Sequence, residues 1–275
     1  MEKQEIRNNQ SGKKLIVLGF VVIAVLFIMY SRYQDPELIM PNTLDSIQRL
    51  ANGFYIILLA ALASITFGIY QFHKYKVQKK NNDLLTIIAL ATWNSKSRKT
   101  FIITFVLYGI FFSLVSGTLV YQPQINFSTN YGAEIPSGFI APCCDSPGYM
   151  PKIIVYITEH VGLQIIPINL VLQIIVSYLV GLNTSIAINA YTISKKGRGV
   201  STIGAAAGLF IACPTCAGSF LSIFVGTASG IALSIALVQL QTLFIAISIP
   251  ILVATPFLMA KKLRNEDGSC KITPE

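Results

Sequence analysis

The sequence predicts an all-α fold: a polytopic membrane bundle of about six transmembrane helices, with both termini inside and an outer loop as a cap. Three observations predict this. Of the 275 residues, 53% are hydrophobic and only 12% are charged, whereas soluble domains carry about 25% charged residues. Apolar runs of roughly 20 residues, long enough to cross a bilayer as a helix, recur along the whole chain. The basic residues fall almost entirely in alternate connections.

The apolar runs are predicted to be helices, since lipid offers no partner for backbone N–H and C=O groups. A closed barrel would need short segments in which polar and apolar residues alternate, and these runs do not alternate. The predicted spans cover approximately residues 14–30, 54–72, 100–120, 161–190, 201–226 and 231–260.

The lysines and arginines predict the orientation of these spans. Of the 21 basic residues, all but Arg32, Arg49 and Lys152 lie in the N-terminal segment, the 73–99 connection, the connection after the fourth span or the C-terminal tail. By the positive-inside rule, both termini are expected in the cytoplasm, with the chain in the cell membrane. The net charge of +9 is then an orientation signal. The expected partner is the lipid bilayer, and nucleic acid is not expected.

This orientation gives the expected organisation of the chain. Residues 1–13 form a cytoplasmic N-terminus, residues 14–260 a single six-helix transmembrane domain, and residues 261–275 a cytoplasmic tail. The outer segment 121–160 is rich in Pro, Gly and Tyr, and a segment of this length is expected to fold as a cap over the outer mouth of the bundle.

An additional inner helix is expected at about residues 82–93. One face of this helix is apolar, with residues at i, i+3, i+4 and i+7. Two interpretations are open for this face, because it suits a helix that lies flat on the inner leaflet as well as one that docks a partner. The face consists of Leu84, Ile87, Ile88 and Ala91.

The fourth predicted span carries a stripe of small and polar residues. Amides in a bilayer are costly unless they bond across helices or face water, so the stripe is interpreted either as interhelical packing or as the lining of a polar path. The stripe comprises Asn169, Gln173, Ser177, Gly181 and Thr184, with Asn183 and Asn189 on neighbouring faces.

Several function classes are not expected. The apolar cores contain no Asp, Glu, Lys, Arg or His, although proton-coupled pumps and most ion-coupled transporters keep ionisable groups there. The chain has no Walker motif, HExxH or GxSxG, which argues against ATP-driven transport and hydrolysis. Thiols are therefore the reactive groups left inside the bilayer.

Two cysteines in the fifth predicted span form the motif "CPTC". Cys213 and Cys216 lie at i and i+3 on one helical face, as a disulfide or a shared metal requires. Pro214 tends to open the helix, and the dipole of the resulting half-helix would favour a thiolate at Cys213. From Ser201, twelve residues at about 1.5 Å each put Cys213 roughly 18 Å deep, past the midplane.

The order Cys-Pro-x-Cys of residues 213–216 resembles the active motif of glutaredoxin- and DsbA-type oxidoreductases. A CxxC pair on a span together with loop cysteines also resembles membrane oxidoreductases of the vitamin K epoxide reductase type. Here the loop cysteines are vicinal and the order of the spans differs, so the chain is not assigned to that family.

The outer segment carries the vicinal pair Cys143 and Cys144. A disulfide between neighbouring residues is strained, so these sulfurs are expected to bond elsewhere, to bind a metal or to attack as thiols. Asp145, Met150 and His160 are near in sequence, and Cys, Met and His together suit a soft ion such as Cu(I).

Three functions remain open. The first is a membrane thiol protein in which Cys213 and Cys216 exchange disulfides with Cys143 and Cys144, with Cys213 as the nucleophile and an extracytoplasmic or membrane protein as partner. The second is a copper-type permease or metal-handling protein that uses the same four sulfurs as ligands. The third is a structural accessory subunit of a membrane complex, in which "CPTC" is a packing kink.

Overall fold

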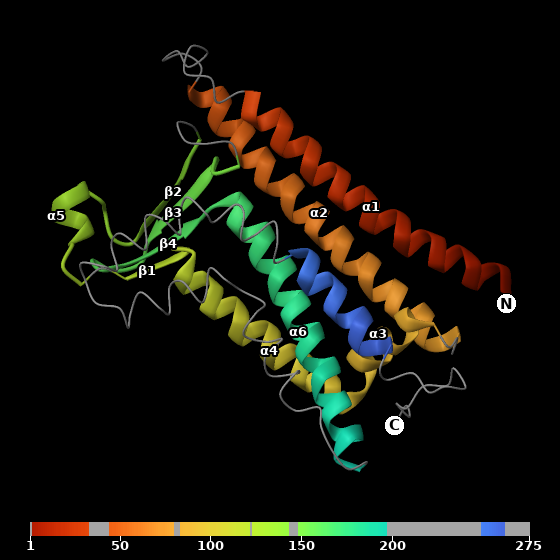
Figure 1. The fold of residues 1–275 in the computed structure, drawn as a ribbon. Coiled ribbons are helices and arrows are strands. Elements are labelled where there is room, and N and C mark those ends of the chain that lie inside the picture. The colour runs from red at the N-terminus through yellow and green to blue at the C-terminus, as the bar shows by residue number, and fades with distance from the viewer. Residues whose placement is uncertain are drawn as a thin grey trace. The chain divides into compact units, whose positions relative to one another are not determined.

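The computed structural model describes residues 2–32, 44–79, 83–121, 123–142, 148–196 and 249–261. The described chain is mostly helical (Figure 1). Four of the described helices are long and apolar enough to cross a membrane, which agrees with the predicted helical membrane protein. These four candidate spans are Ser11–Arg32, Asp45–Lys79, Ser97–Leu114 and Pro167–Asn189. The fifth predicted span, 201–226, and most of the sixth, 231–260, lie outside the described residues.

The chain forms two compact units, each built from two separate stretches of sequence. The first unit comprises Met1–Tyr75 and Ser116–Gln173, and the second comprises Lys76–Val115 and Ile174–Glu275. The first unit therefore contains a pair of long helices, a short helix, the start of another and a β-sheet, whereas the second contains helices alone among its described residues.

In the first unit, helices α1 (Glu2–Arg32) and α2 (Leu44–Lys79) pack as an antiparallel hairpin. Small residues let the two backbones approach closely. A Cβ added at Gly68 would lie 2.8 Å from the carbonyl oxygen of Gly12, and one added at Gly19 would meet Ile65. The Ser64 hydroxyl also donates to the Leu15 carbonyl, at 3.3 Å. The two helices are thus in contact along most of their length.

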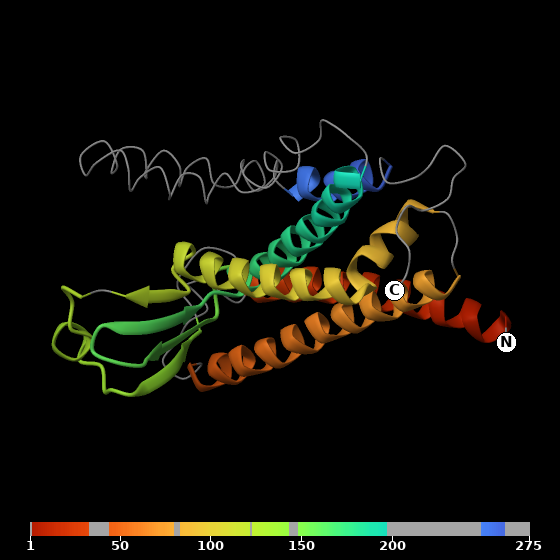
Figure 2. The same ribbon diagram turned by 90° about the horizontal axis from the view of Figure 1, so that it is seen from below.

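The segment predicted as an outer loop is a folded four-stranded antiparallel sheet with strand order β1-β4-β3-β2. The all-α prediction is wrong for this segment. Phe139, Ile154 and Gln164 are cross-strand neighbours in the register of the three longer strands. Figure 2 shows the sheet at the end of α2 that begins with Leu44, away from the N-terminus of α1. The elements are β1 (Leu119–Tyr121), α5 (Phe127–Tyr131), β2 (Ser137–Ala141), β3 (Lys152–Tyr156) and β4 (Val161–Ile165).

The sheet also changes the ends of two predicted spans. Helix α4 (Ser95–Val115) ends before the predicted boundary at residue 120, and helix α6 (Pro167–Lys196) begins after the predicted boundary at residue 161. Residues 161–165 continue the apolar run in sequence but form strand β4. Pro167 explains where the helix starts, because proline lacks an N–H and its fixed φ suits the first helical position.

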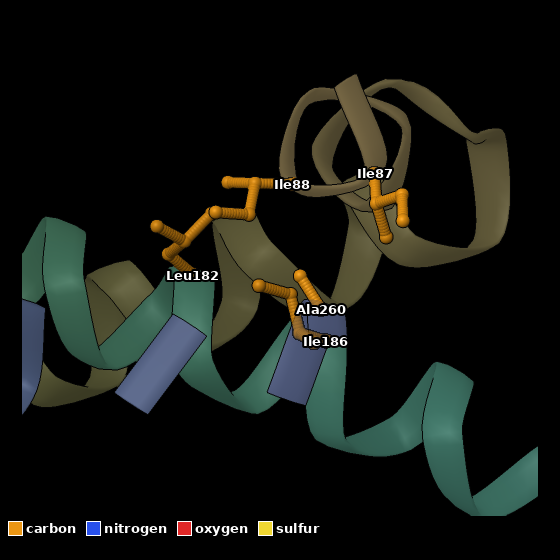
Figure 3. Packing of buried hydrophobic residues seen from close by; sticks show 5 residues of the cluster. All are labelled: Ile87, Ile88, Leu182, Ile186 and Ala260. Atoms are coloured by element: carbon orange, nitrogen blue, oxygen red, sulfur yellow. The ribbon is translucent and has the colours of Figure 1, made fainter. Parts of the chain in front are cut away.

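The second unit is built on α3 (Leu84–Trp93), α4, most of α6 and a C-terminal helix, Ile249–Lys261. Its core joins three of these helices (Figure 3), where Ile88 of α3 lies beside Leu182 of α6. Ile87 and Ile88, on the predicted apolar face of α3, are 1% and 5% exposed. These two residues of the face are therefore packed against α6 and the C-terminal helix. The buried cluster consists of Ile87, Ile88, Leu182, Ile186 and Ala260.

Candidate functional site

The predicted site residues Cys143, Cys144, Cys213 and Cys216 lie outside the described residues, as do Asp145 and Cys270. The chain on both sides of Cys143 and Cys144 is described, up to Pro142 and again from Gly148. The candidate site is therefore built from the residues that hold these two flanks.

The first flank is held by α1. Tyr30, two residues before the end of this helix, donates its hydroxyl to the carbonyl oxygen of Pro142 at 2.5 Å. Tyr30 is buried, and a buried tyrosine places its ring in an apolar environment while its O–H finds an acceptor. Cys143 follows Pro142 directly in the chain. The residue directly before the vicinal pair is therefore bonded to the end of α1.

The second flank is held by α2. The hydroxyl of Tyr55 donates to the carbonyl oxygens of Pro151, at 2.6 Å, and of Ile165, at 3.1 Å. Met150 and Pro151 are buried beside this contact. One tyrosine of α2 thereby connects the start of β3 with the end of β4.

Gly148 attaches the second flank to α6 and α1. Its carbonyl oxygen accepts from the backbone N–H of Ile168, at 3.2 Å. Its φ of +88° lies in the left-handed region that favours glycine. A Cβ at this position would approach the side chains of Ile168 and Phe27 at 3.4 and 3.7 Å. Glycine at position 148 thus fits both the left-handed turn and the close packing of the Ile168 and Phe27 side chains.

An aromatic cluster supports the two tyrosines. Phe54 of α2 lies at the centre, with its ring centroid 5.6 Å from Phe27, 5.0 Å from Tyr30 and 5.7 Å from Tyr55. All three pairs are edge-to-face, an arrangement that aromatic rings favour. Phe54 is 2% exposed, so the cluster is a packed core at this end of the helix pair. We call Phe27, Tyr30, Phe54 and Tyr55 the aromatic anchor.

Of the predicted soft-metal ligands, the structure describes Met150 and His160, and these two are not brought together. Met150 lies just before β3, whereas His160 follows it at the other end of the strand. Five strand residues at about 3.3 Å each separate the two by roughly 17 Å. The His160 ring contacts the Ile125 carbonyl oxygen through Nδ1, at 2.9 Å. Among the residues with described positions, no group of three His, Cys, Asp or Glu side chains could hold a metal ion.

Three polar residues of α6 in the second unit, Asn183, Ser185 and Asn189, bond to neighbouring helices. The amide of Asn189 and the hydroxyl of Ser97 on α4 are in contact, with Asn189 Nδ2 donating to Ser97 Oγ at 2.7 Å. Ser185 donates to the Ser97 carbonyl oxygen at 3.3 Å, and Asn183 donates to the Leu252 carbonyl oxygen at 3.1 Å. Gly181 lets Phe101 approach, since an added Cβ would lie 3.1 Å from its ring. The contacts of Gly181, Asn183 and Asn189 favour the interhelical packing interpretation, whereas the hydroxyl of Thr184 bonds within α6.

Comparisons with models of protein families, with curated proteins and with solved structures give no match for this chain. The aromatic anchor was not identified from the sequence. Tyr30 and Tyr55 stand near ends of predicted spans, where aromatic residues commonly occupy the membrane interface. Their hydrogen-bond acceptors are backbone carbonyls. Every residue has such a carbonyl, so the sequence does not show which of them a tyrosine contacts.

Proposed function

We propose that this chain is an integral membrane thiol protein, in which Cys143 and Cys144 exchange disulfides with Cys213 and Cys216 and with an extracytoplasmic protein partner. The supporting observation is the attachment of both flanks of the vicinal pair to the membrane helices, through Tyr30 and Tyr55. The two residues that flank the pair, Pro142 and Pro151, are each bonded to a helix of the first unit, and this attachment supports a working role for the pair beside the membrane.

The proposed topology has six spans, both termini in the cytoplasm and the sheet outside the cell membrane. The chain enters the sheet four residues after α4 ends and leaves it two residues before α6 begins. Lys74, Lys76 and Lys79 lie at the far end of α2, and Arg98 and Lys99 at the far end of α4. This distribution supports an orientation with the sheet outside, because basic residues are retained in the cytoplasm.

The proposed chemistry is thiol–disulfide exchange. A Cys213 thiolate attacks a disulfide that holds Cys143 or Cys144, so one S–S bond forms, one breaks, and the departing thiolate takes a proton. The Cys216 thiolate then attacks the mixed disulfide and releases the outer thiol. Two electrons and two protons have moved outward, and Cys213–Cys216 is left as a disulfide. The outer disulfide that is reduced joins Cys143 or Cys144 to a cysteine of the extracytoplasmic partner, and both of these cysteines are left as thiols.

A trapping experiment tests this scheme. Replacing Cys216 with serine removes the resolving thiol, so the mixed disulfide between Cys213 and the outer pair is expected to accumulate. The control is the single variant Cys270→Ser, since it also loses one thiol but keeps all four proposed working cysteines. The bond is identified by peptide mass spectrometry after thiols are blocked in intact membranes.

The alternatives give different results in the same sample. Stoichiometric Cu(I) with all four sulfurs reduced, lost when either pair is replaced, would identify a metal-handling protein. Co-purification with other membrane subunits, unchanged when both pairs are replaced, would identify an accessory subunit. Either result would overturn the exchange proposal.

A further inference from the structure

The sequence Asn-Phe-Ser at residues 126–128 begins at the residue before α5 and runs into that helix. An asparagine followed two residues later by serine or threonine is the acceptor of N-linked glycans, provided that it lies on the surface of a domain outside the cytoplasm. The chain contains this pattern three times, at Asn9, Asn126 and Asn183. The structure gives the three asparagines different surroundings.

Asn183 is used for helix packing. Its Nδ2 donates to the Leu252 carbonyl oxygen at 3.1 Å and to the Leu179 carbonyl oxygen of its own helix at 2.9 Å. It also lies inside the candidate span Pro167–Asn189. Asn9 belongs to α1 ahead of the candidate span that begins at Ser11, in the segment whose basic residues indicate the cytoplasm. Neither position suits a glycan.

Asn126 lies at the surface of the sheet unit with its side chain in a defined turn. Its Oδ1 accepts from the backbone N–H groups of Ser128, at 2.9 Å, and Thr129, at 3.3 Å. One Nδ2 hydrogen is donated to Glu159 Oε2 at 2.7 Å, and this bond is also exposed. The acceptor asparagine and Ser128 are therefore held at the surface, two residues apart, by hydrogen bonds within the turn.

The middle residue of the pattern fixes the turn on the sheet. Phe127 is 4% exposed and packs against Tyr156, with ring centroids 5.1 Å apart. Gly162 makes room for it, since an added Cβ there would lie 3.4 Å from the Phe127 ring. Ser128 and Thr129 are exposed. With Phe127 turned into the sheet unit, a sugar attached to Asn126 would extend away from the packed side.

We propose that Asn126 carries an N-linked glycan. The transfer forms a bond between Nδ2 and the first sugar carbon and breaks the bond from that carbon to a polyprenyl diphosphate, which leaves. The displaced Nδ2 proton goes to a base of the membrane oligosaccharyltransferase. The second Nδ2 hydrogen stays, so the bond to Glu159 is kept. Tyr131, five residues after the acceptor asparagine, is 62% exposed.

The test is translation of the full chain with microsomes that contain oligosaccharyltransferase, followed by endoglycosidase treatment. One removable glycan is expected, which is lost in Asn126→Gln and in Ser128→Ala but retained in Ser128→Thr. Asn9→Gln and Asn183→Gln are matched controls that keep the glycan. No glycan on the unaltered chain, while a control glycoprotein in the same reaction is modified, would overturn the proposal. Loss of the glycan in Asn9→Gln alone would also overturn it, because the sheet would then be on the cytoplasmic side.

This inference is independent of the thiol chemistry. The double variant Cys143→Ser, Cys144→Ser is expected to keep the glycan, although the exchange proposal predicts that it loses disulfide transfer. Loss of the glycan in this double variant would contradict the independence of the two proposals.

Discussion

The hydroxyl of Tyr55 on α2 donates to the carbonyl oxygen of Pro151, 96 residues later in the chain, at 2.6 Å. The same hydroxyl lies 3.1 Å from the carbonyl oxygen of Ile165. One hydroxyl proton is thus shared between two backbone acceptors at the ends of two strands, with the shorter contact to Pro151. The Tyr55 hydroxyl thereby holds the sheet to the hairpin of α1 and α2. A phenylalanine ring at this position could not make these hydrogen bonds.

Tyr55→Phe is expected to destabilise the first unit by about 1–3 kcal/mol, because the two carbonyls lose a donor while they remain buried. The ring packing against Phe54 is kept, so the loss reports on the hydroxyl. The measurement is the unfolding midpoint of the protein in mild detergent. Tyr131→Phe is the control, since the Tyr131 side chain is 62% exposed. Equal midpoints for the two variants would contradict the anchoring role of Tyr55.

Gly68→Ala is expected to weaken the α1–α2 pair. The new Cβ would lie 2.8 Å from the Gly12 carbonyl oxygen, and backbone atoms cannot move aside as a flexible side chain can. Overpacking of this kind typically costs about 1–3 kcal/mol. Gly53→Ala on the same helix is the matched control, because a Cβ there meets nothing within 4 Å. That change is expected to be neutral or stabilising by up to about 1 kcal/mol, since alanine favours helix. The unfolding midpoints of both variants in detergent check this contrast, and a Gly68→Ala protein as stable as Gly53→Ala would refute the close contact.

Ser97 and Asn189 are expected to show coupled effects on the stability of the second unit. Removing either side chain breaks the same bond between α4 and α6, and such bonds in membrane helices contribute about 0.5–2 kcal/mol. Ser97→Ala and Asn189→Ala together should therefore cost less than the sum of the single changes. A double-mutant cycle of unfolding free energies measures this coupling. Thr255→Ala in place of Asn189→Ala is the additive control, as the Thr255 hydroxyl bonds within its own helix.

The long helices could be predicted from the sequence because hydropathy alone determines them. Runs of about 20 apolar residues without charge predicted α1, α2, α4 and α6, and the helical spacing of Leu84, Ile87, Ile88 and Ala91 predicted α3. The same spacing could not show what covers that face. Lipid, a partner and the protein's own α6 present similar apolar surfaces, so the pattern of α3 is the same for each.

The sheet could not be recognised because its strands are short and apolar on both faces. Residues 152–156 read "KIIVY" and residues 161–165 read "VGLQI", and runs of this length do not distinguish a strand from the start of a buried helix. Pro167 is the signal that could have separated β4 from α6, since proline favours the first position of a helix. The aromatic anchor depends on long-range bonds to backbone carbonyls, which no local pattern encodes.

The central proposal is thiol exchange between the outer pair and the membrane pair. Its most direct test is mass-spectrometric mapping of all five cysteines in protein whose thiols are blocked in intact membranes, with metal analysis of the same sample. A disulfide from Cys143 or Cys144 to Cys213, or a reversible Cys213–Cys216 bond without metal, is the predicted result. Four reduced and unreactive thiols in metal-free protein would contradict it.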